Sequence, residues 1–188
     1  MTRNAVLAAC IALLLIGTGS GQEAKRVQEP EYIGVFYFVE SATGALTPLE
    51  RQTPEVKIKV KALGFGGGEG SIEVKGGKSP TRFKAAQPLS FVVRLASQQV
   101  DPLGVIQFFS LESKKDKRRL VISKAGSMGM SGKSVAGASA VSFNVSRYGE
   151  SSFKISPVRD LPPGEYALSG EGIKDGFCFG VDPAEGGK

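Results

Sequence analysis

The sequence predicts an all-β fold, a single antiparallel β-sandwich of about ten short strands, and three observations support this prediction. Short runs with a period of two recur along the chain, as at residues 56–62 and 89–96, which is the pattern of strands with one buried face. Glycine and proline, with 25 and 10 copies, separate these runs. No convincing helix pattern follows the first 21 residues. A β-barrel shares these features and is the alternative.

The expected strands are joined by short connections, and the clearest hairpin lies in the middle of the chain. There, the runs at 105–111 and 119–123 flank a polar loop, as in two antiparallel strands. The stretches at 64–70 and 124–139 are rich in glycine or small polar residues and are expected to be loops. The expected strands are residues 32–39, 46–49, 56–62, 71–74, 81–84, 89–96, 105–111, 119–123, 140–146, 152–156, 161–168 (a proline-stiffened turn leading into a strand) and 177–181.

The first 21 residues have the pattern of a secretory signal peptide. Arg3 supplies positive charge, residues 5–16 are apolar, and residues 17–21 are the small residues that a signal peptidase accepts. The apolar run is shorter than the roughly 20 residues needed to span a bilayer, which favours cleavage over an uncleaved anchor. Cys10 ends a lipobox-like LeuAlaAlaCys, but most of the apolar run follows it, which argues against lipidation.

One domain is expected after the signal peptide. A chain of 188 residues, 41% hydrophobic and 22% charged, is long enough for one core. We expect a flexible lead-in at 22–31, the β-sandwich domain at 32–183 and a disordered tail at 184–188. The domain is expected in the periplasm, at the cell surface or outside the cell, with no transmembrane span in the mature chain.

The residue types present exclude most catalytic chemistry. The chain has no histidine, which removes Ser-His-Asp and Cys-His nucleophile systems and the usual zinc ligands. Once Cys10 leaves with the signal peptide, Cys178 is the only thiol, so no internal disulfide can form. Cys178 lies between Phe177 and Phe179 and is interpreted as a small buried residue. A reactive thiol or an intermolecular bridge is the alternative.

No cofactor or metal site is expected. The GlyLysSer triplets at 77–79 and 132–134 lack the spacing and the following helix of a phosphate-binding loop. The aspartates stand singly at turns, without the spacing of a calcium loop. Glu40, Glu69 or Glu73 could still meet across strands as the two carboxylates of a glycosidase.

Two basic features are candidate binding sites. The formal net charge of +6 favours acidic partners. Lys57, Lys59 and Lys61 share one face of an expected strand and form a candidate polyanion-binding face, although lysines on an edge strand also prevent aggregation. The second basic patch lies at the hairpin tip and comprises Lys114, Lys115, Lys117, Arg118 and Arg119. Neither patch is interleaved with aromatic residues, so no specific nucleic acid is expected.

Two segments carry resemblances. LeuProProGlyGluTyr, residues 161–166, resembles the penultimate turn of many immunoglobulin-like bacterial modules. This resemblance implies an immunoglobulin-like or similar sandwich in which the Tyr166 hydroxyl ties down the turn. Residues 40–52 are similar to segments of exported bacterial proteins to which no function is attached.

These observations together favour a non-enzymatic binding or structural module, exported to the bacterial cell envelope or beyond. Its partner is not identified; an acidic envelope component or a protein fits the charge. A carboxylate-based hydrolase is one alternative. A small-molecule or lipid carrier is the other, with a cavity lined by Tyr32, Phe36 and Phe38.

Overall fold

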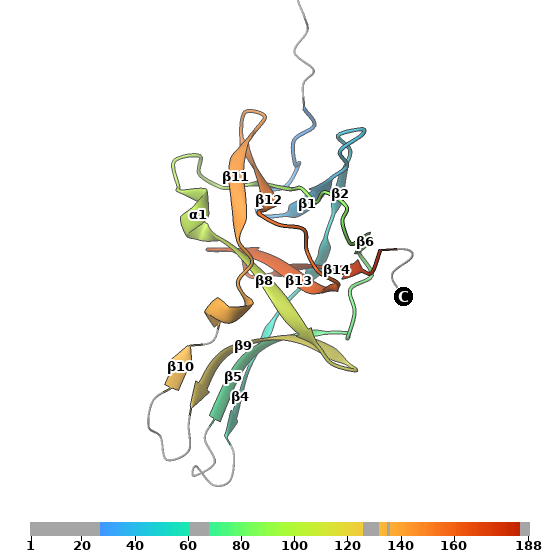
Figure 1. Cartoon of the computed structure of the whole chain (residues 1–188). Helices are drawn as coiled ribbons and strands as arrows, with labels where there is room; N and C mark the ends of the chain where they lie inside the picture. The colour runs from blue at the N-terminus through green and yellow to red at the C-terminus, as the bar shows by residue number, and fades with distance from the viewer. Residues whose placement is uncertain (1–26, 61–67, 126–131, 135, 185–188) are drawn as a thin grey trace, which may run out of the picture.

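The computed structural model describes residues 27–60, 68–125, 132–134 and 136–184, and these form a β-sandwich (Figure 1). The strands divide into two sheets, so the all-β sandwich prediction is confirmed and no single closed barrel is formed. Named strands pair antiparallel, except for one parallel pair between β6 and β14. The expected signal peptide at 1–21 lies outside the described residues.

The smaller sheet has five strands and the larger has nine, and each is built from segments far apart in the sequence. The smaller sheet has the order β11(Phe143–Tyr148), β12(Ser152–Pro157), β7(Phe91–Arg94), β1(Phe36–Val39), β2(Leu46–Pro48). The larger has the order β3(Glu50–Gln52), β14(Gly176–Asp182), β13(Gly164–Gly170), β8(Ile106–Ser113), β9(Lys117–Ala125), β5(Gly68–Lys75), β4(Glu55–Val60). Two short strands complete it, β6(Arg82–Lys84) beside β14 and β10(Gly132–Ser134) beside β9.

A phenylalanine-rich core lies between the two sheets. Phe36 and Phe91 of the smaller sheet are fully buried, as is Phe179 of the larger one. The rings of Phe91 and Phe179 have centroids 4.7 Å apart, and Tyr166 stacks on Phe179 at 5.4 Å. Strict alternation places these side chains on the inner face of each strand, so apolar burial stabilises the sandwich.

Tyr166 ties down the turn before its strand, as the sequence predicted. Its hydroxyl donates a hydrogen bond to the carbonyl oxygen of Pro162 at 2.7 Å, and its ring is buried in the core. The polar end of the side chain is therefore satisfied while the ring adds apolar contact.

Several features differ from the expected pattern, among them strand β3(Glu50–Gln52), which is not among the expected strands. A single helical turn, α1(Pro102–Val105), follows Asp101, whose carboxylate accepts a hydrogen bond from the Leu103 amide at 3.0 Å. The 3₁₀ turn η3(Ala136–Ser139) follows β10. Strands β5, β9 and β10 also extend into stretches expected to be loops, because pairing with neighbouring strands imposes extended geometry even on glycine.

The end of the expected flexible lead-in is docked on the domain. Pro30 is fully buried. The Glu29 carboxylate accepts hydrogen bonds from the backbone amide of Glu150 at 2.6 Å and from the hydroxyls of Ser151 and Ser152, both at 2.6 Å. These contacts fix the chain to the β11–β12 turn.

Candidate functional site

The larger sheet divides into a body and an arm at the β8–β9 hairpin. Strand β8 pairs with β13 over six residues, but with β9 only at Glu112–Arg119 and Ser113–Arg118. Strand β9 then diverges and pairs with β5, which pairs with β4. We call β4, β5, β9 and β10 the arm; it projects away from the sandwich body in Figure 1. The predicted hairpin is therefore real, but its two strands separate.

The concave face of this curled sheet, opposite the sandwich core, has a polar half and an apolar half. Cross-strand partners point to the same side of a sheet, so the register assigns the members of this face. The polar half contains Glu50, Glu165, Cys178 and Arg118. The apolar half contains Phe109, Leu111, Leu120, Ile72, Val74 and Val56.

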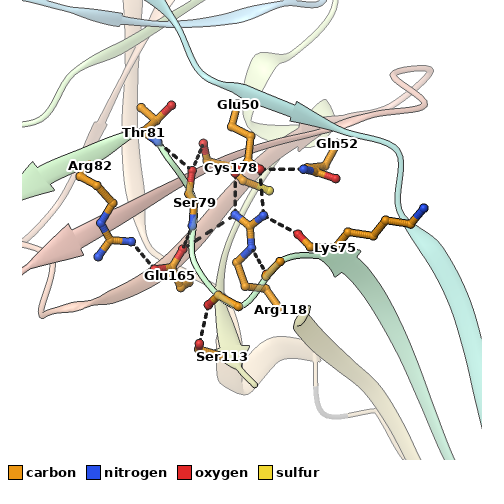
Figure 2. Close-up of polar contacts among 12 residues, drawn as sticks. Glu50, Gln52, Lys75, Ser79, Thr81, Arg82, Ser113, Arg118, Glu165 and Cys178 are labelled. Carbon is orange, nitrogen blue, oxygen red and sulfur yellow. Dashed lines mark hydrogen bonds and ion pairs between the residues drawn. The ribbon is translucent and has the colours of Figure 1, made fainter. Parts of the chain in front are cut away.

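Arg118 is the centre of the polar half and is fully buried (Figure 2). Its guanidinium donates two hydrogen bonds to the Glu50 carboxylate, at 2.7 and 3.0 Å. It also donates to the carbonyl oxygens of Gly76 at 2.9 Å and Lys75 at 2.8 Å. Burial alone would lower the pKa of Arg118, but the bonds to Glu50 outweigh it and raise that pKa. Arg118 therefore links the arm to β3 at the far edge of the body.

A second arginine completes this network on the other side of Glu165. Arg82 forms an ion pair with Glu165 and a second one with Asp182, whose oxygen lies 2.6 Å from the guanidinium. A Cβ at Gly180 would collide with the Arg82 guanidinium, so a larger residue there would displace Arg82 from this position. The other Glu165 oxygen accepts the Ser79 amide at 2.9 Å.

The segment 76–80 covers the polar half. Gly76 has a φ of +79°, and a Cβ at Gly77 would collide with the backbone carbonyl of Lys114, so both glycines are required. Ser79, within this segment, is buried. The GlyLysSer triplet at 77–79 is thus part of a structural cover.

Cys178 is buried inside the same network. Burial raises the pKa of its thiol to about 12, although the charge of Arg118 acts in the opposite direction. The thiolate form that would react or bind a metal is therefore suppressed, and the interpretation as a small buried residue is confirmed. Within the described ranges, no group of three or more acidic or cysteine side chains could hold a metal ion.

The apolar half forms a groove in the angle between arm and body. Its volume is about 100 Å³. It is lined chiefly by Pro54, Ile72, Val74, Phe109, Leu111, Leu120 and Ala167. Val56 pairs with Ile72 in register and extends this face to the end of the arm. Val56 is 67% exposed and Ile58 is 78% exposed, so two large apolar side chains next to the groove face solvent.

Strand β4 is the edge of the sheet in the described part of the chain. It pairs with β5 on one side, and no described strand pairs with its other side. Its exposed edge therefore presents backbone N–H and C=O groups beside the two exposed apolar side chains. The expectation that the apolar residues of this strand are buried is wrong for Val56 and Ile58, because no element among residues 27–60, 68–125, 132–134 and 136–184 covers them.

The other face of the arm is convex and charged, and it contains the predicted polyanion-binding face. Lys57 and Lys59 both point to this side and are exposed, whereas Lys61 lies outside the described residues. Lys57 forms an ion pair with Glu55 at 2.6 Å. Lys59 has no ion pair with any described residue. The lysines thus share the face with carboxylates.

Two further carboxylates on the convex face are paired with basic side chains. Glu73 accepts a hydrogen bond from Lys117 at 2.8 Å, and Glu69 accepts one from Arg119 at 2.7 Å. The Lys117 contact lowers the pKa of Glu73. This face therefore carries mixed charge, which weakens its attraction for a large polyanion.

The second basic patch is divided by the structure. Lys114 and Lys115 are exposed at the hairpin tip. Lys117 and Arg119 bond the arm's own carboxylates, and Arg119 also lies 2.8 Å from Glu112. Arg118 is fully buried and contributes nothing to a surface patch. The burial of Arg118 could be read from the strand pattern, because residues two apart share a face and Arg118 shares its face with the apolar Leu120. Lys117 and Arg119 lie on the opposite face.

The residues of the two alternative functions are not gathered into a catalytic or carrier site. Glu69 and Glu73 are engaged as described, and Glu40 accepts the Thr43 hydroxyl at 2.5 Å. Phe36 and Phe38 are packed in the core. Tyr32 lines an open depression of about 500 Å³, and neither Phe36 nor Phe38 is among the residues that line it.

Glu50 and Glu165 approach the same guanidinium, at 2.7 and 3.8 Å, and no sequence pattern indicated this. Burial alone would raise the pKa of Glu50, but its bonds to Arg118 lower it overall. A general acid needs a raised pKa, so the lowered pKa of Glu50 does not suit it to that role.

No protein-family model, curated protein or solved structure matches this chain. Among the described residues, every helix is too short to cross a membrane.

Proposed function

We propose that this chain is an exported, non-enzymatic binding module that takes up an extended segment of a partner protein. The segment would pair with the open edge of β4 and place side chains into the adjoining groove. The observation that carries the proposal is the exposure of Val56 and Ile58, at 67% and 78%, on an edge strand. Contiguous exposed apolar side chains are characteristic of interaction sites.

Strand addition is the binding mode that this geometry supports best. The open edge of β4 offers a row of backbone donors and acceptors, which an extended segment satisfies by main-chain hydrogen bonds. Every second side chain of that segment would lie over Val56 and Ile58 and towards the groove. Main-chain pairing thus supplies affinity and the groove supplies selectivity.

The size of the groove favours a side chain over a small-molecule ligand. Its volume of about 100 Å³ is well below the roughly 300–1,000 Å³ typical of small-molecule pockets. The neighbouring Glu50 and Glu165 are engaged with arginines, which argues against a hydrolase at this position. Export rests on the pattern of residues 1–21 and places the partner at the cell envelope or outside the cell.

Selection of displayed peptides tests this function. Random twelve-residue peptides are selected on the immobilised chain, and the dissociation constants of synthetic copies are measured against wild type, Ile58→Ser and Leu103→Ser. Leu103 is a matched control because it is apolar and 59% exposed, but lies on α1. We expect Ile58→Ser to weaken binding by about tenfold or more through lost apolar contact, and Leu103→Ser to leave it unchanged.

Hydrogen exchange of the complex shows where the peptide binds. Amides of β4 on its open side should become protected when a selected peptide is present. Selection of no peptide, equal binding by all three proteins, or protection confined to other strands would overturn the proposal.

A further inference from the structure

We infer that the partner segment alternates apolar and acidic residues, an inference that rests on the proposed function of the β4 edge. Strand β4 has two different faces along its open edge. Val56 and Ile58 lie on the concave side, and Lys57 and Lys59 lie on the convex side. An added strand has the same period of two, so one of its faces meets apolar side chains and the other meets lysines.

Charge complementarity identifies the second face of the partner as acidic. Lys59 is exposed and has no ion pair with a described residue, so it is available to a carboxylate on an added strand. Lys57 is half-exposed, and its one ion pair with a described residue is with Glu55, itself 53% exposed. An incoming acidic residue opposite Lys57 or Lys59 is favourable, whereas a basic residue in that place is unfavourable.

The position of Glu55 makes the charge pattern along β4 different at its two ends, so the two orientations of an added strand are not equivalent. Glu55 begins β4 on the same convex side as the two lysines. The partner residue opposite Glu55 should therefore be neutral or basic, while those opposite Lys57 and Lys59 should be acidic. The order of charges along the segment thus selects one strand direction.

A second copy of this chain fits the edge less well. The two antiparallel self-pairings with the longest overlap are centred on Lys57 and on Ile58. The first places Lys57 opposite Lys57, but it also places Glu55 opposite Lys59 in two symmetric pairs; the second places Lys57 opposite Lys59 in two pairs. Like charges directly opposite one another destabilise a strand pair, so the second pairing is unfavourable and the first keeps one Lys57–Lys57 contact. An acidic segment places a carboxylate opposite both lysines without that contact, and therefore fits the edge better than a second copy does.

Three synthetic nine-residue peptides test the inference. Valine occupies alternate positions in all three, and the other positions are glutamate, lysine or threonine. Each favourable cross-strand charge pair contributes a factor of about two to five in affinity. We therefore expect the glutamate peptide to bind wild type about tenfold or more tightly than the lysine peptide at low salt, with a smaller ratio at 0.5 M salt.

Two matched charge reversals locate the effect. In Lys59→Glu the preference for the glutamate peptide should disappear or reverse. In Lys115→Glu it should persist, because Lys115 carries the same charge at the hairpin tip, away from the open edge of β4. Two further glutamate peptides are N-methylated on alternate residues, one on the odd and one on the even positions. Their affinities should differ, because only one of these two sets of backbone N–H groups faces the β4 edge.

The outcomes separate this inference from the proposed function. If all three peptides bind equally and Ile58→Ser weakens all of them, the edge site stands and the acidic pattern is overturned. A glutamate preference that survives in Lys59→Glu also overturns it. A concentration-dependent dimer in analytical ultracentrifugation that Lys59→Glu alters would make a second copy the occupant and would likewise overturn it.

Discussion

In the sandwich body, strands β13 and β14 bury Leu168, Phe177 and Phe179 against a second sheet, whereas in the arm, strand β4 leaves Val56 and Ile58 in solvent. Both regions belong to one sheet and use the same alternation of side chains. They differ in the face that carries the apolar side chains: those of the body face the smaller sheet, whereas those of β4 lie on the other face of the sheet, where no described strand packs on them. Apolar residues in the body therefore stabilise the fold, and those of the arm are available to a partner.

Charged side chains also differ in burial, between the junction of arm and body and the arm itself. At the junction of arm and body, Arg118 and Glu165 are almost completely excluded from solvent and belong to one network, in which Arg118 bonds Glu50 and Glu165 pairs with Arg82. In the arm, Lys57 and Glu55 form an exposed pair of the kind that adds little to stability, because solvent screens it. Buried charge at the junction is thus expected to matter for stability, and arm charge mainly for recognition.

Removing the buried cation at the junction should have the largest effect. Arg118→Met leaves Glu50 and Glu165 buried with one arginine fewer, which should lower the free energy of unfolding by about 3–5 kcal/mol. Urea denaturation measures the loss. Because Arg118 joins the arm to β3, amide exchange should rise in β5 and β9 before it rises in β14.

A double variant distinguishes loss of charge balance from loss of packing. Arg118→Met with Glu50→Gln removes both members of the bidentate pair, while Arg82 still neutralises Glu165. We expect this double variant to recover much of the lost stability, because no unpaired charge then remains buried. A single variant within about 1 kcal/mol of wild type would show that the junction is not held by this pair.

Truncating one apolar residue in each region measures how much apolar side chains contribute to stability in the body and in the arm. Leu168→Ala opens a cavity in the core and should lower the free energy of unfolding by about 2–5 kcal/mol. Ile58→Ala removes an exposed side chain and should change it by less than about 0.5 kcal/mol. Thermal and urea unfolding check both values, and a comparable loss for Ile58→Ala would show that the chain itself covers the arm.

The body could be predicted from the sequence more fully than the arm. Alternation at 89–96 and 140–146 indicates strands whose apolar face meets another layer, and β7 shows this. The same alternation at 56–62 predicts β4 but not its exposure, because period identifies two faces and not what covers them. Whether a layer covers a face depends on contacts between distant segments, which one sequence does not display.

The burial of the polar network could not be predicted from the sequence either, for the same reason. Glu50 and Glu165 each occupy the polar phase of a short strand, as a solvent-facing glutamate would. Their burial arises from segment 76–80 crossing above them and from the curl that brings Arg118 near β3. Arg118 alone carried a local signal, its phase with Leu120. A charged residue in an apolar phase is therefore a better indicator of a buried ion pair than clustering of charge.

A smaller loss than that of Arg118→Met or Leu168→Ala is expected at Glu29, where the body extends to the segment that precedes β1. Burial alone would raise the pKa of Glu29, but hydrogen bonds from Ser151, Ser152 and the backbone of Glu150 lower it from 4.5 to about 2. A carboxylate whose pKa is lower in the folded state contributes stability above pH 4.5 and loses it as the pH falls towards 2. Glu29→Gln should therefore cost about 1–2 kcal/mol at pH 7, a value reduced by partial exposure to solvent.

Denaturation at a series of pH values checks this prediction against Glu31→Gln, a change to an exposed carboxylate two residues away. The difference between wild type and Glu29→Gln should be constant from pH 7 to 5 and should shrink between pH 4.5 and 2. Amide exchange should rise at the β11–β12 turn and not in β4, because Glu29 contacts only the body among the described residues. A difference that stays constant down to pH 2 would mean that Glu29 acts through packing, and the segment would then be held chiefly by the buried Pro30.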